Sequence, residues 1–380
     1  MKVLYYSPHP DLDNTKPSGY STHINEVILA LQNKNIEVKS LILGKKKPTQ
    51  TKAKDYKKRK NNILRNSLSD LKLIIFDVFK ARKKLKQAIN EFQPDLVYER
   101  SNYLQFSGVK ICRKKGLIHF LELNAPYTEQ RKELKGQSLF YGFSKRVEKY
   151  KFHNSSKIFP VSAALGNFIV DNYNIDKERI VPSLMAVRNR PIFKEENNKN
   201  KKITIGYIGS VFPWNGIELL INMLNKKDFK EKFILKIIGG GSYLDYLLNK
   251  IVKPDNVEII NWLGQEEIKK HMTSFDLAIL PNFNWYSSPT KILEYGLYEI
   301  PIIAANTPAI KELINNTDLG SLVTPLSEKE ISEKLKRYLV NPIEFKQKSL
   351  NFKKHILRYH TWDNRASDII NEYAKINRHS

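Results

Sequence analysis

Short apolar segments alternate with helical patterns along nearly the whole chain, and this alternation constrains the fold more than any other feature. In the first half, the segments typical of buried strands are Lys2–Ser7, Val38–Leu43, Asp95–Tyr98, Gly116–Leu123 and Ile158–Val161. In the second half, they are Ile203–Ile208, Phe233–Ile238, Val257–Ile260, Leu277–Leu280, Ile302–Ala305 and a segment near Leu322–Val323. Strands that alternate with helices predict parallel sheets covered by helices on both faces.

A charged segment without apolar residues, Lys194–Lys202, separates the two runs and is typical of a linker. We therefore expect an α/β protein with two Rossmann-like domains, residues 1–197 and 198–357, that face a central cleft. In open α/β sheets, ligands bind beyond the carboxyl ends of the strands. The residues that follow each strand are the candidates for a site.

The chain carries 64 Lys and Arg against 39 Asp and Glu, a net charge of +25. Such a charge favours polyanions: nucleic acid, an anionic bilayer or phosphorylated small molecules. The single cysteine, Cys112, excludes an intrachain disulfide and a cysteine-rich metal site. We expect a cytoplasmic location, because no apolar run approaches a membrane span and the first residues do not resemble a signal peptide.

Glycines follow two of the predicted strands in the second half. Gly209 comes after Ile203–Ile208, and Gly239–Gly241 comes after Phe233–Ile238, each before a helical pattern. Glycines let the backbone approach a ligand, and a helix N-terminus attracts an anion. Tight turns without a ligand are the alternative.

The stretch from Ser287 to Gly296 is the most informative. Ser288 is predicted to cap a helix whose first residue is Pro289, which makes Lys291 the third helical residue. A cation there opposes the helix dipole unless a phosphate binds beside it. Glu294 lies on the same helix face, so the pair suits a nucleotide sugar, with Lys291 on phosphate and Glu294 on ribose. A solvated Lys–Glu pair is the alternative.

Three positions in the first half are candidates for the acceptor side. Gly19, where a helix is predicted to begin, would let the backbone approach a substrate, whereas His23 in its first turn is more typical of a structural histidine. Glu122 and Asn124 share one face at the end of a predicted strand. A capped turn before Pro126 is the alternative for this pair.

Taken together, these pieces resemble the retaining glycosyltransferases of family 4, which have the GT-B fold. The matching stretches are Ser18–His23, Pro94–Arg100, Glu122–Pro126, the Gly209 turn, Ile238–Gly241, Trp262–Gly264, Ser288–Tyr295, Pro301–Ala304 and Tyr359–Trp362. They occur in the family order, and the Ser-Pro-x-Lys-x-x-Glu-Tyr stretch is the most specific. The last stretch resembles the point where the final helix, residues 358–380, crosses back to the first domain.

The resemblance implies a nucleoside-diphosphate sugar bound by the second domain. Glu294 would hold the ribose, the backbone at Leu263 and Gly264 the base, and Gly209 with Lys291 the diphosphate. The other donor-binding residues that it implies are Asn215, Gly240 and Ser288. The residues that it places at the reacting sugar and acceptor are Gly19, Glu122 and Asn124. It implies no cofactor and no metal, because positive groups and helix ends stabilise the leaving diphosphate.

The sequence also departs from the family pattern. Tyr286 stands where the family has the first glutamate of its Glu-x7-Glu motif, and Ser210 and Asn215 replace two cations. Lys291, a regular feature of the Pro-x-Lys branch, supplies a cation instead. The alternative function is therefore that of a catalytically inactive relative that binds sugar nucleotides or glycans.

Much of the positive charge lies in the segment Lys45–Arg65 and in the apolar-basic helix around Leu68–Leu85 that follows it. A second cluster with aromatic residues runs from Leu139 to Arg146. Such segments suit the anionic inner face of the cytoplasmic membrane, so we expect peripheral docking and a glycan or lipid-linked acceptor in cell-envelope polysaccharide or glycolipid synthesis. Nucleic acid is not expected, because basic and aromatic residues are not interleaved on one element, but a nucleic-acid binder is a further alternative.

Overall fold

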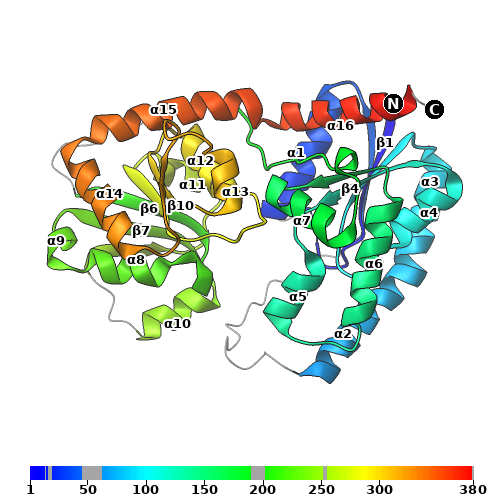
Figure 1. Cartoon of the computed structure of the whole chain (residues 1–380), viewed down its shortest axis with the longest axis horizontal. Helices are drawn as coiled ribbons and strands as arrows, with labels where there is room; N and C mark the ends of the chain where they lie inside the picture. Colours follow the sequence, from blue (N-terminus) through cyan, green and yellow to red (C-terminus); the bar gives the residue numbers. More distant parts are fainter. Residues whose placement is uncertain (13, 16–18, 45–61, 190–201, 251–254, 379–380) are drawn as a thin grey trace. The chain divides into compact units, whose positions relative to one another are not determined.

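The computed structural model describes residues 1–12, 14–15, 19–44, 62–189, 202–250 and 255–378 (Figure 1). Their contacts divide the chain into two compact units. The first comprises the described residues up to 184 and from 362 onward, and the second runs from 185 to 361. The predicted linker lies outside the described residues except for Lys202, and so does the basic segment Lys45–Arg65 up to residue 61. The predicted boundary between residues 197 and 198 falls in the same undescribed stretch.

The first unit is built on a parallel sheet with the strand order β2-β1-β3-β4-β5. Its strands are β1 (Lys2–Ser7), β2 (Glu37–Ile42), β3 (Leu96–Arg100), β4 (Ile118–Leu123) and β5 (Lys157–Pro160). Its helices are α1 (Gly19–Asn33), α2 (Ile63–Ile75), η2 (Phe76–Ala81), α3 (Arg82–Phe92), α4 (Ser107–Lys115), α5 (Tyr127–Lys135), α6 (Tyr141–Asn154), α7 (Ala163–Tyr173), η3 (Lys177–Arg179) and α16 (Trp362–Asn377).

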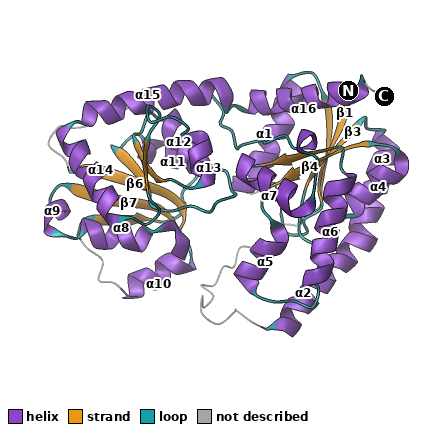
Figure 2. Cartoon of the chain, in the orientation of Figure 1, coloured by secondary structure: helices purple, strands orange, loops and turns teal. Residues whose placement is uncertain are grey.

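The second unit is built on a parallel sheet with the order β11-β10-β9-β6-β7-β8. Its strands are β6 (Ile203–Ser210), β7 (Phe233–Gly240), β8 (Val257–Ile260), β9 (Leu277–Leu280), β10 (Ile302–Ala305) and β11 (Ser321–Val323). Its helices are η4 (Pro213–Asn215), α8 (Ile217–Leu224), α9 (Lys227–Lys230), α10 (Ser242–Lys250), α11 (Gln265–Met272), α12 (Thr290–Leu297), α13 (Pro308–Leu313), α14 (Glu328–Val340) and α15 (Pro342–Tyr359). Helices flank the strands of each sheet, which confirms the predicted fold class (Figure 2).

At three of the strand boundaries that differ from the predicted ones, a glycine is the reason. β6 and β7 continue to Ser210 and Gly240, past the predicted strand ends, because Gly209 pairs with Gly239 in register. A Cβ on Gly239 would lie 2.3 Å from the carbonyl oxygen of Gly209, so only glycine allows the strands to run this close. β4 begins two residues later than predicted, because Gly116 adopts the left-handed conformation that ends α4.

The core of the first unit packs α3 against the sheet. Leu85 and Ala88 of this helix meet Leu4 and Val97 of the central strands, and all four side chains are buried. Cys112 of α4 belongs to the same cluster and is fully buried. Burial also raises the pKa of its thiol well above the ordinary value, so the thiolate is disfavoured.

The long helix predicted around Leu68–Leu85 is interrupted by a π-helical segment, η2. Asp77 of this segment is fully buried, and its carboxylate accepts the backbone N–H groups of Phe106 and Ser107, both at 3.1 Å. These N–H groups belong to the start of α4, where a negative charge is favourable. The segment therefore fastens the long helix to α4.

The predicted return of the last helix to the first unit is confirmed, because α16 packs against α1. The ring of Trp362, its first residue, meets the edge of His23 of α1 with the ring centroids 5.2 Å apart. None of the helices in the described part of the chain is long and apolar enough to span a bilayer.

Candidate functional site

The topology of the second sheet selects one place for a ligand. The chain builds outward from β6 through β7 to β8, then returns to the other side of β6 and continues through β9, β10 and β11. The connections after β6 and β9 therefore leave in opposite directions, and such a switch point opens a crevice at the carboxyl ends of the strands. The predicted donor residues follow β6, β7, β8 and β9, the four strands around this crevice.

Lys291 and Gly209 meet at the switch point. Gly209, the next-to-last residue of β6, has a φ of +119°, and a Cβ added to it would lie 2.6 Å from Cε of Lys291. Nζ of Lys291 donates a hydrogen bond of 2.8 Å to the hydroxyl of Tyr207 and lies 4.2 Å from the centroid of that ring. The tyrosine thus holds the ammonium beside the half-buried main chain of Gly209. The two residues predicted to share the diphosphate do lie together.

Glu294, one turn after Lys291 on α12, is half-buried. Burial raises the pKa of its carboxyl to about 7, although the ammonium of Lys291 opposes the shift. Burial likewise lowers the pKa of Lys291 to about 8, and here the carboxylate opposes the shift. Neither a hydrogen bond nor an ion pair holds the Glu294 carboxylate within the described parts of the chain. This carboxylate is therefore available to a ligand.

Ser288 and Asn215 serve the fold of the site. The helix begins at Thr290, one residue later than predicted, and Ser288 does not cap it. Instead, the Ser288 hydroxyl accepts the backbone N–H of Met185 at 2.9 Å. Asn215 is buried, and its side-chain oxygen accepts the N–H of Phe212 at 2.8 Å, which closes the turn after β6.

Gly240, Leu263 and Gly264 lie on the β7 and β8 side of the crevice. A Cβ on Gly240 would lie 3.2 Å from Nε1 of Trp262, so the indole lies against the main chain of this glycine. Gly264 precedes α11, and its N–H donates to Glu267 at 3.2 Å. Leu263 between them is half-buried.

The same loops carry exposed aromatic side chains, to which the sequence pattern alone assigned no role in binding. Trp262 is 60% exposed, and Phe212 stacks on Trp214 with centroids 4.6 Å apart. Trp285 meets Tyr286, the residue that replaces the family glutamate, at 5.2 Å. The signal that could have found them is their position, because each directly follows a strand or lies in the loop after one.

In the first unit, Glu122 lies at the centre of a buried cluster. One carboxylate oxygen accepts from Arg100 and, at 2.7 Å, from the Asn124 amide, and the other lies 2.9 Å from Nε2 of His23. Burial alone would raise the pKa of this carboxyl, but His23 and Arg100 lower it to about 2. We call these four residues the Glu122 cluster. Glu122 and Asn124 lie together as predicted, but both carboxylate oxygens of Glu122 contact protein groups.

Gly19 and Asn124 are the accessible residues of the predicted acceptor side. Gly19 begins α1 and is exposed, and a Cβ placed on it would meet nothing within 4 Å. Ser18, its predecessor in the stretch Ser18–His23 that resembles the family, lies outside the described residues. Asn124 is half-buried, with its amide turned to Glu122. Among the described residues, no group of three or more His, Cys, Asp or Glu is placed to hold a metal ion.

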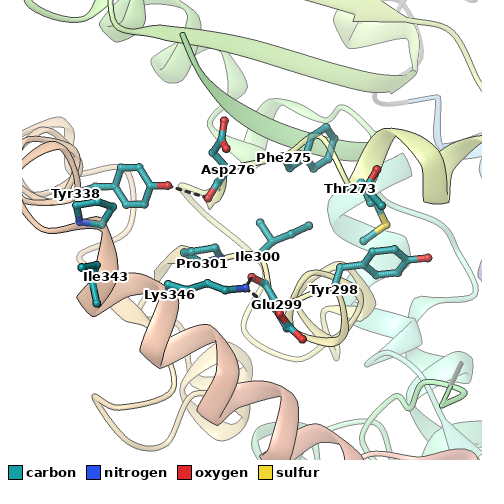
Figure 3. Close-up of a pocket in the computed structure, with 12 residues that line it drawn as sticks. Thr273, Phe275, Asp276, Tyr298, Glu299, Ile300, Pro301, Tyr338, Ile343 and Lys346 are labelled. Carbon is teal, nitrogen blue, oxygen red and sulfur yellow. Dashed lines mark hydrogen bonds and ion pairs between the residues drawn. The ribbon is translucent and has the colours of Figure 1, made fainter. Parts of the chain in front are cut away.

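A cavity of about 380 Å³ in the second unit lies at the opposite edge of the sheet, because Asp276 and Pro301 on its wall precede β9 and β10 (Figure 3). Its polar groups already have partners. The Asp276 carboxylate accepts the Thr204 N–H at 2.8 Å, and Glu299 pairs with Lys346 at 2.8 Å. None of the predicted donor residues lines this cavity.

Two family models match the chain and together cover most of it. Glycosyltransferase Family 4 matches residues 17–182, and Glycosyl transferases group 1 matches residues 189–355. The chain belongs to the family 4-like glycosyltransferases of the GT-B fold. The first match covers the unit that holds the Glu122 cluster, and the second covers the unit that holds Lys291 and Glu294.

Several relatives resemble this glycosyltransferase over nearly their full length. The uncharacterized glycosyltransferase MJ1069 of Methanocaldococcus jannaschii is 24% identical, over 93% of this chain and 95% of its own. Sucrose-phosphate synthase of Thermosynechococcus elongatus superposes with a TM-score of 0.74 at 13% identity, over 100% of both chains. Anabaena Alr3699/HepE in complex with UDP superposes with a TM-score of 0.68 at 15% identity, over 99% of this chain and 100% of its own. The two solved structures show that the fold is shared.

Proposed function

We propose that this glycosyltransferase moves a sugar from a nucleoside-diphosphate sugar to a glycan or lipid-linked acceptor, with retention of configuration. The observation that carries the proposal is the pair at the switch point of the second sheet. Tyr207 holds the Lys291 ammonium beside the main chain of Gly209, and the Glu294 carboxylate one turn away has no hydrogen-bond or ion-pair partner among the described residues. Phosphate oxygens suit the first group, and vicinal hydroxyls suit the second.

In this proposal, Lys291 stabilises the diphosphate as it leaves. Its lowered pKa means that the site disfavours the ammonium until an anion arrives. A bound diphosphate favours the charged form of Lys291. The ammonium then stabilises the diphosphate most strongly in the transition state, where negative charge develops on the leaving group. Glu294 accepts the ribose hydroxyls, and the exposed indole of Trp262 offers a face for the base. That UDP binds the Anabaena relative is compatible with a uridine donor here.

In the first unit, we propose that Glu122 is a positioning residue. Its carboxylate fixes the Asn124 amide and the His23 ring, and neither of its oxygens remains for a substrate. Asn124 and Gly19 are the residues proposed to meet the reacting sugar and the acceptor. No bound metal takes part in the proposal, and the cytoplasmic location and the role in cell-envelope synthesis stay predictions from the sequence.

A second candidate function rests on Tyr286. This residue stands where the family pattern has a glutamate, and it is buried beside Trp285. Because Asn215 also replaces a cation and closes a turn, a relative that binds a donor without transferring its sugar fits these residues as well.

The experiment combines donor binding with turnover. Thermal shift and calorimetry with UDP-, GDP-, ADP- and dTDP-glucose identify the nucleotide, and release of the nucleoside diphosphate reports transfer or hydrolysis. We expect one nucleotide to bind, with turnover that EDTA does not reduce. Binding without any turnover would favour the second candidate. If none of the four donors bound, or if EDTA stopped the reaction, the proposed donor chemistry would be wrong.

A further inference from the structure

Helix α2 has its polar side inward and its apolar side outward. Its buried residues are Asn66, Ser67 and Asp70. Its exposed residues include Leu64, which is 71% exposed, and Leu68, which is 61% exposed. A surface helix of a globular protein has the opposite arrangement, with its apolar stripe against the core.

Polar contacts fix this orientation of the helix. The Asn66 amide donates to the carbonyl groups of Lys135 at 2.7 Å and Gln137 at 2.9 Å. Asp70 is fully buried and pairs with Arg131 at 2.9 Å. A rotation that buried the leucines would break these bonds and leave buried polar groups unpaired. The polar contacts of α2 therefore keep its apolar side exposed in the folded unit.

The exposed apolar side chains form one surface, which we call the outer face. Spacings of three and four residues place those of the long helix on a single side, namely Leu64, Leu68, Leu71, Ile75 and Phe79. Leu139, which is 75% exposed, adjoins the same helix, because its N–H donates to the hydroxyl of Ser67 at 3.0 Å. The aromatic cluster predicted from Leu139 to Arg146 thus adjoins the helix that the sequence also singled out. A contiguous apolar surface of this kind marks an interaction site.

A basic pocket continues the same helix run. It has a volume of about 320 Å³ between α3, α4 and α6, and none of the described residues that line it is acidic. Its basic residues are Arg82, Lys86, Lys110, Arg113, Lys114 and Lys115. Arg82 and Lys86 lie three and seven residues after Phe79, so the apolar row leads to the pocket. Both carboxylates between residues 63 and 86, Asp70 and Asp77, are fully buried, which leaves the exposed side of this run free of negative charge.

We infer that the outer face docks this protein on an anionic lipid bilayer. The leucines and Phe79 enter the boundary between head groups and acyl chains, and the basic pocket receives lipid phosphate groups. An apolar row flanked by cations is the pattern of helices that lie in this boundary. A second copy of the chain is a poorer occupant, because it would bring the same cations against one another. This surface is independent of the donor site in the second unit.

Flotation with vesicles tests the inference without any need for activity. Wild-type protein is expected to float with phosphatidylcholine vesicles that contain about 30% phosphatidylglycerol, and not with pure phosphatidylcholine. Raising the salt from about 0.05 M to about 0.5 M should weaken binding, because the screening length shortens several-fold. Each cation near the surface accounts for about a fivefold change in binding. The variant R82Q/K86Q should therefore bind anionic vesicles at least tenfold more weakly.

Matched controls separate the outer face from general surface chemistry. L68Q/F79Q removes two exposed apolar side chains of the outer face, and V340Q/I343Q removes two from α14 and α15, where Val340 is 85% exposed. K227Q/K270Q removes two exposed cations of the second unit. We expect L68Q/F79Q to lose binding tenfold or more with an unchanged melting temperature, and both control variants to bind as wild type does.

Three results would overturn the inference. One is flotation that does not distinguish anionic from neutral vesicles at low salt. Another is a loss of binding in the control variants equal to the loss in the outer-face variants. The third is a wild-type dimer in sedimentation that L68Q/F79Q converts to monomer, because the outer face would then be a contact between copies of the chain.

Discussion

Each of the two units holds a glutamate near a cation, buried in the first unit and half-buried in the second. The pKa values of the two carboxyls are shifted in opposite directions. Glu122 in the first unit has protein partners on both oxygens, and its pKa falls to about 2. Glu294 in the second unit has none among the described residues, and its pKa rises to about 7. The first arrangement stabilises the folded chain. The second costs stability, which is the usual mark of a group kept for a ligand.

The largest effect is expected from Glu122→Gln. The change leaves Arg100 and His23 without the carboxylate, so the free energy of unfolding should fall by about 3 kcal/mol. Chemical denaturation at pH 7 measures this loss. Asn124→Ala is the control, with an expected loss of about 1 kcal/mol or less because Asn124 is half-buried. A loss below 1 kcal/mol for Glu122→Gln would show that the cluster does not stabilise the fold.

The lowered pKa of Glu122 also predicts how the free energy of unfolding changes in acid. Its pKa is about 2 in the folded chain against an ordinary value of 4.5, so its contribution is complete above pH 4.5 and disappears as the pH falls toward 2. The wild type should lose about 3 kcal/mol more than Glu122→Gln over this window. If the unfolding free energies of the two proteins changed with pH in parallel, the lowered pKa of Glu122 would be contradicted.

Lys291→Met should reduce turnover of the donor by about 100-fold or more, because the leaving diphosphate loses its cation. The same change should not destabilise the protein. The pKa of Lys291 is lowered from 10.5 to about 8, so its ammonium opposes folding fully below pH 8 and less as the pH rises toward 10.5. Such a shift would be worth about 3 kcal/mol in a fully buried group. Solvent screens the half-buried lysine, so its removal should raise the unfolding free energy by about 1 kcal/mol at pH 7. Lys270→Met removes an exposed lysine of α11 and is the control for both assays. Unchanged turnover in Lys291→Met would contradict the proposed donor site.

Gly209→Ala tests the close approach at the switch point. The new Cβ would lie 2.6 Å from Cε of Lys291, at a φ of +119° that side chains rarely adopt. We expect a loss of stability of about 1–3 kcal/mol and weaker donor binding, measured by denaturation and calorimetry. Gly142→Ala is the matched control, because a Cβ there meets nothing within 4 Å. Equal behaviour of the two variants would show that the approach is not required.

Glu294→Gln should have the smallest effect on stability, and its sign is opposite to that of Glu122→Gln. A raised pKa means that the folded chain loses stability as the pH rises from 4.5 through 7. A shift of this size would be worth about 3 kcal/mol in a fully buried group. Solvent screens the half-buried Glu294, so the neutral amide should gain about 1 kcal/mol at pH 8 and nothing at pH 4. Donor affinity should fall about tenfold, because a carboxylate accepts hydroxyl hydrogen bonds better than an amide. Destabilisation at pH 8 would mean that Glu294, like Glu122, serves the fold.

The sequence predicted most of the fold and part of the site, and the division has a physical basis. Strand alternation and the returning helix depend on local patterns, which a single sequence contains. The approach of Lys291 to Gly209 follows from the order of the elements, because Gly209 lies near the end of β6 and Lys291 lies in the helix that follows the neighbouring strand β9. The partner of Ser288 is a backbone N–H 103 residues away, and the partners of Glu122 include His23, 99 residues away. Such contacts decide whether a polar residue serves the fold or a ligand, and they depend on the tertiary structure.

The pattern of residue types also did not predict which side of a helix is buried when both sides could face the core. The long helix around Leu68–Leu85 was correctly assigned an apolar and a basic character, but the sequence could not say which side faces outward. The buried pair of Asp70 with Arg131 settles this orientation. The π-helical turn around Asp77 was not predicted either, because the bonds that favour it come from α4.

The complete burial of Cys112 makes this chain convenient for spectroscopy. A thiol that is both inaccessible and held protonated reacts slowly with maleimides and methanethiosulfonates. A cysteine introduced at an exposed position such as Phe79 or Val340 would then take up one label per molecule, with the native thiol left in place. Fluorophores or spin labels attached in this way could report on each unit separately.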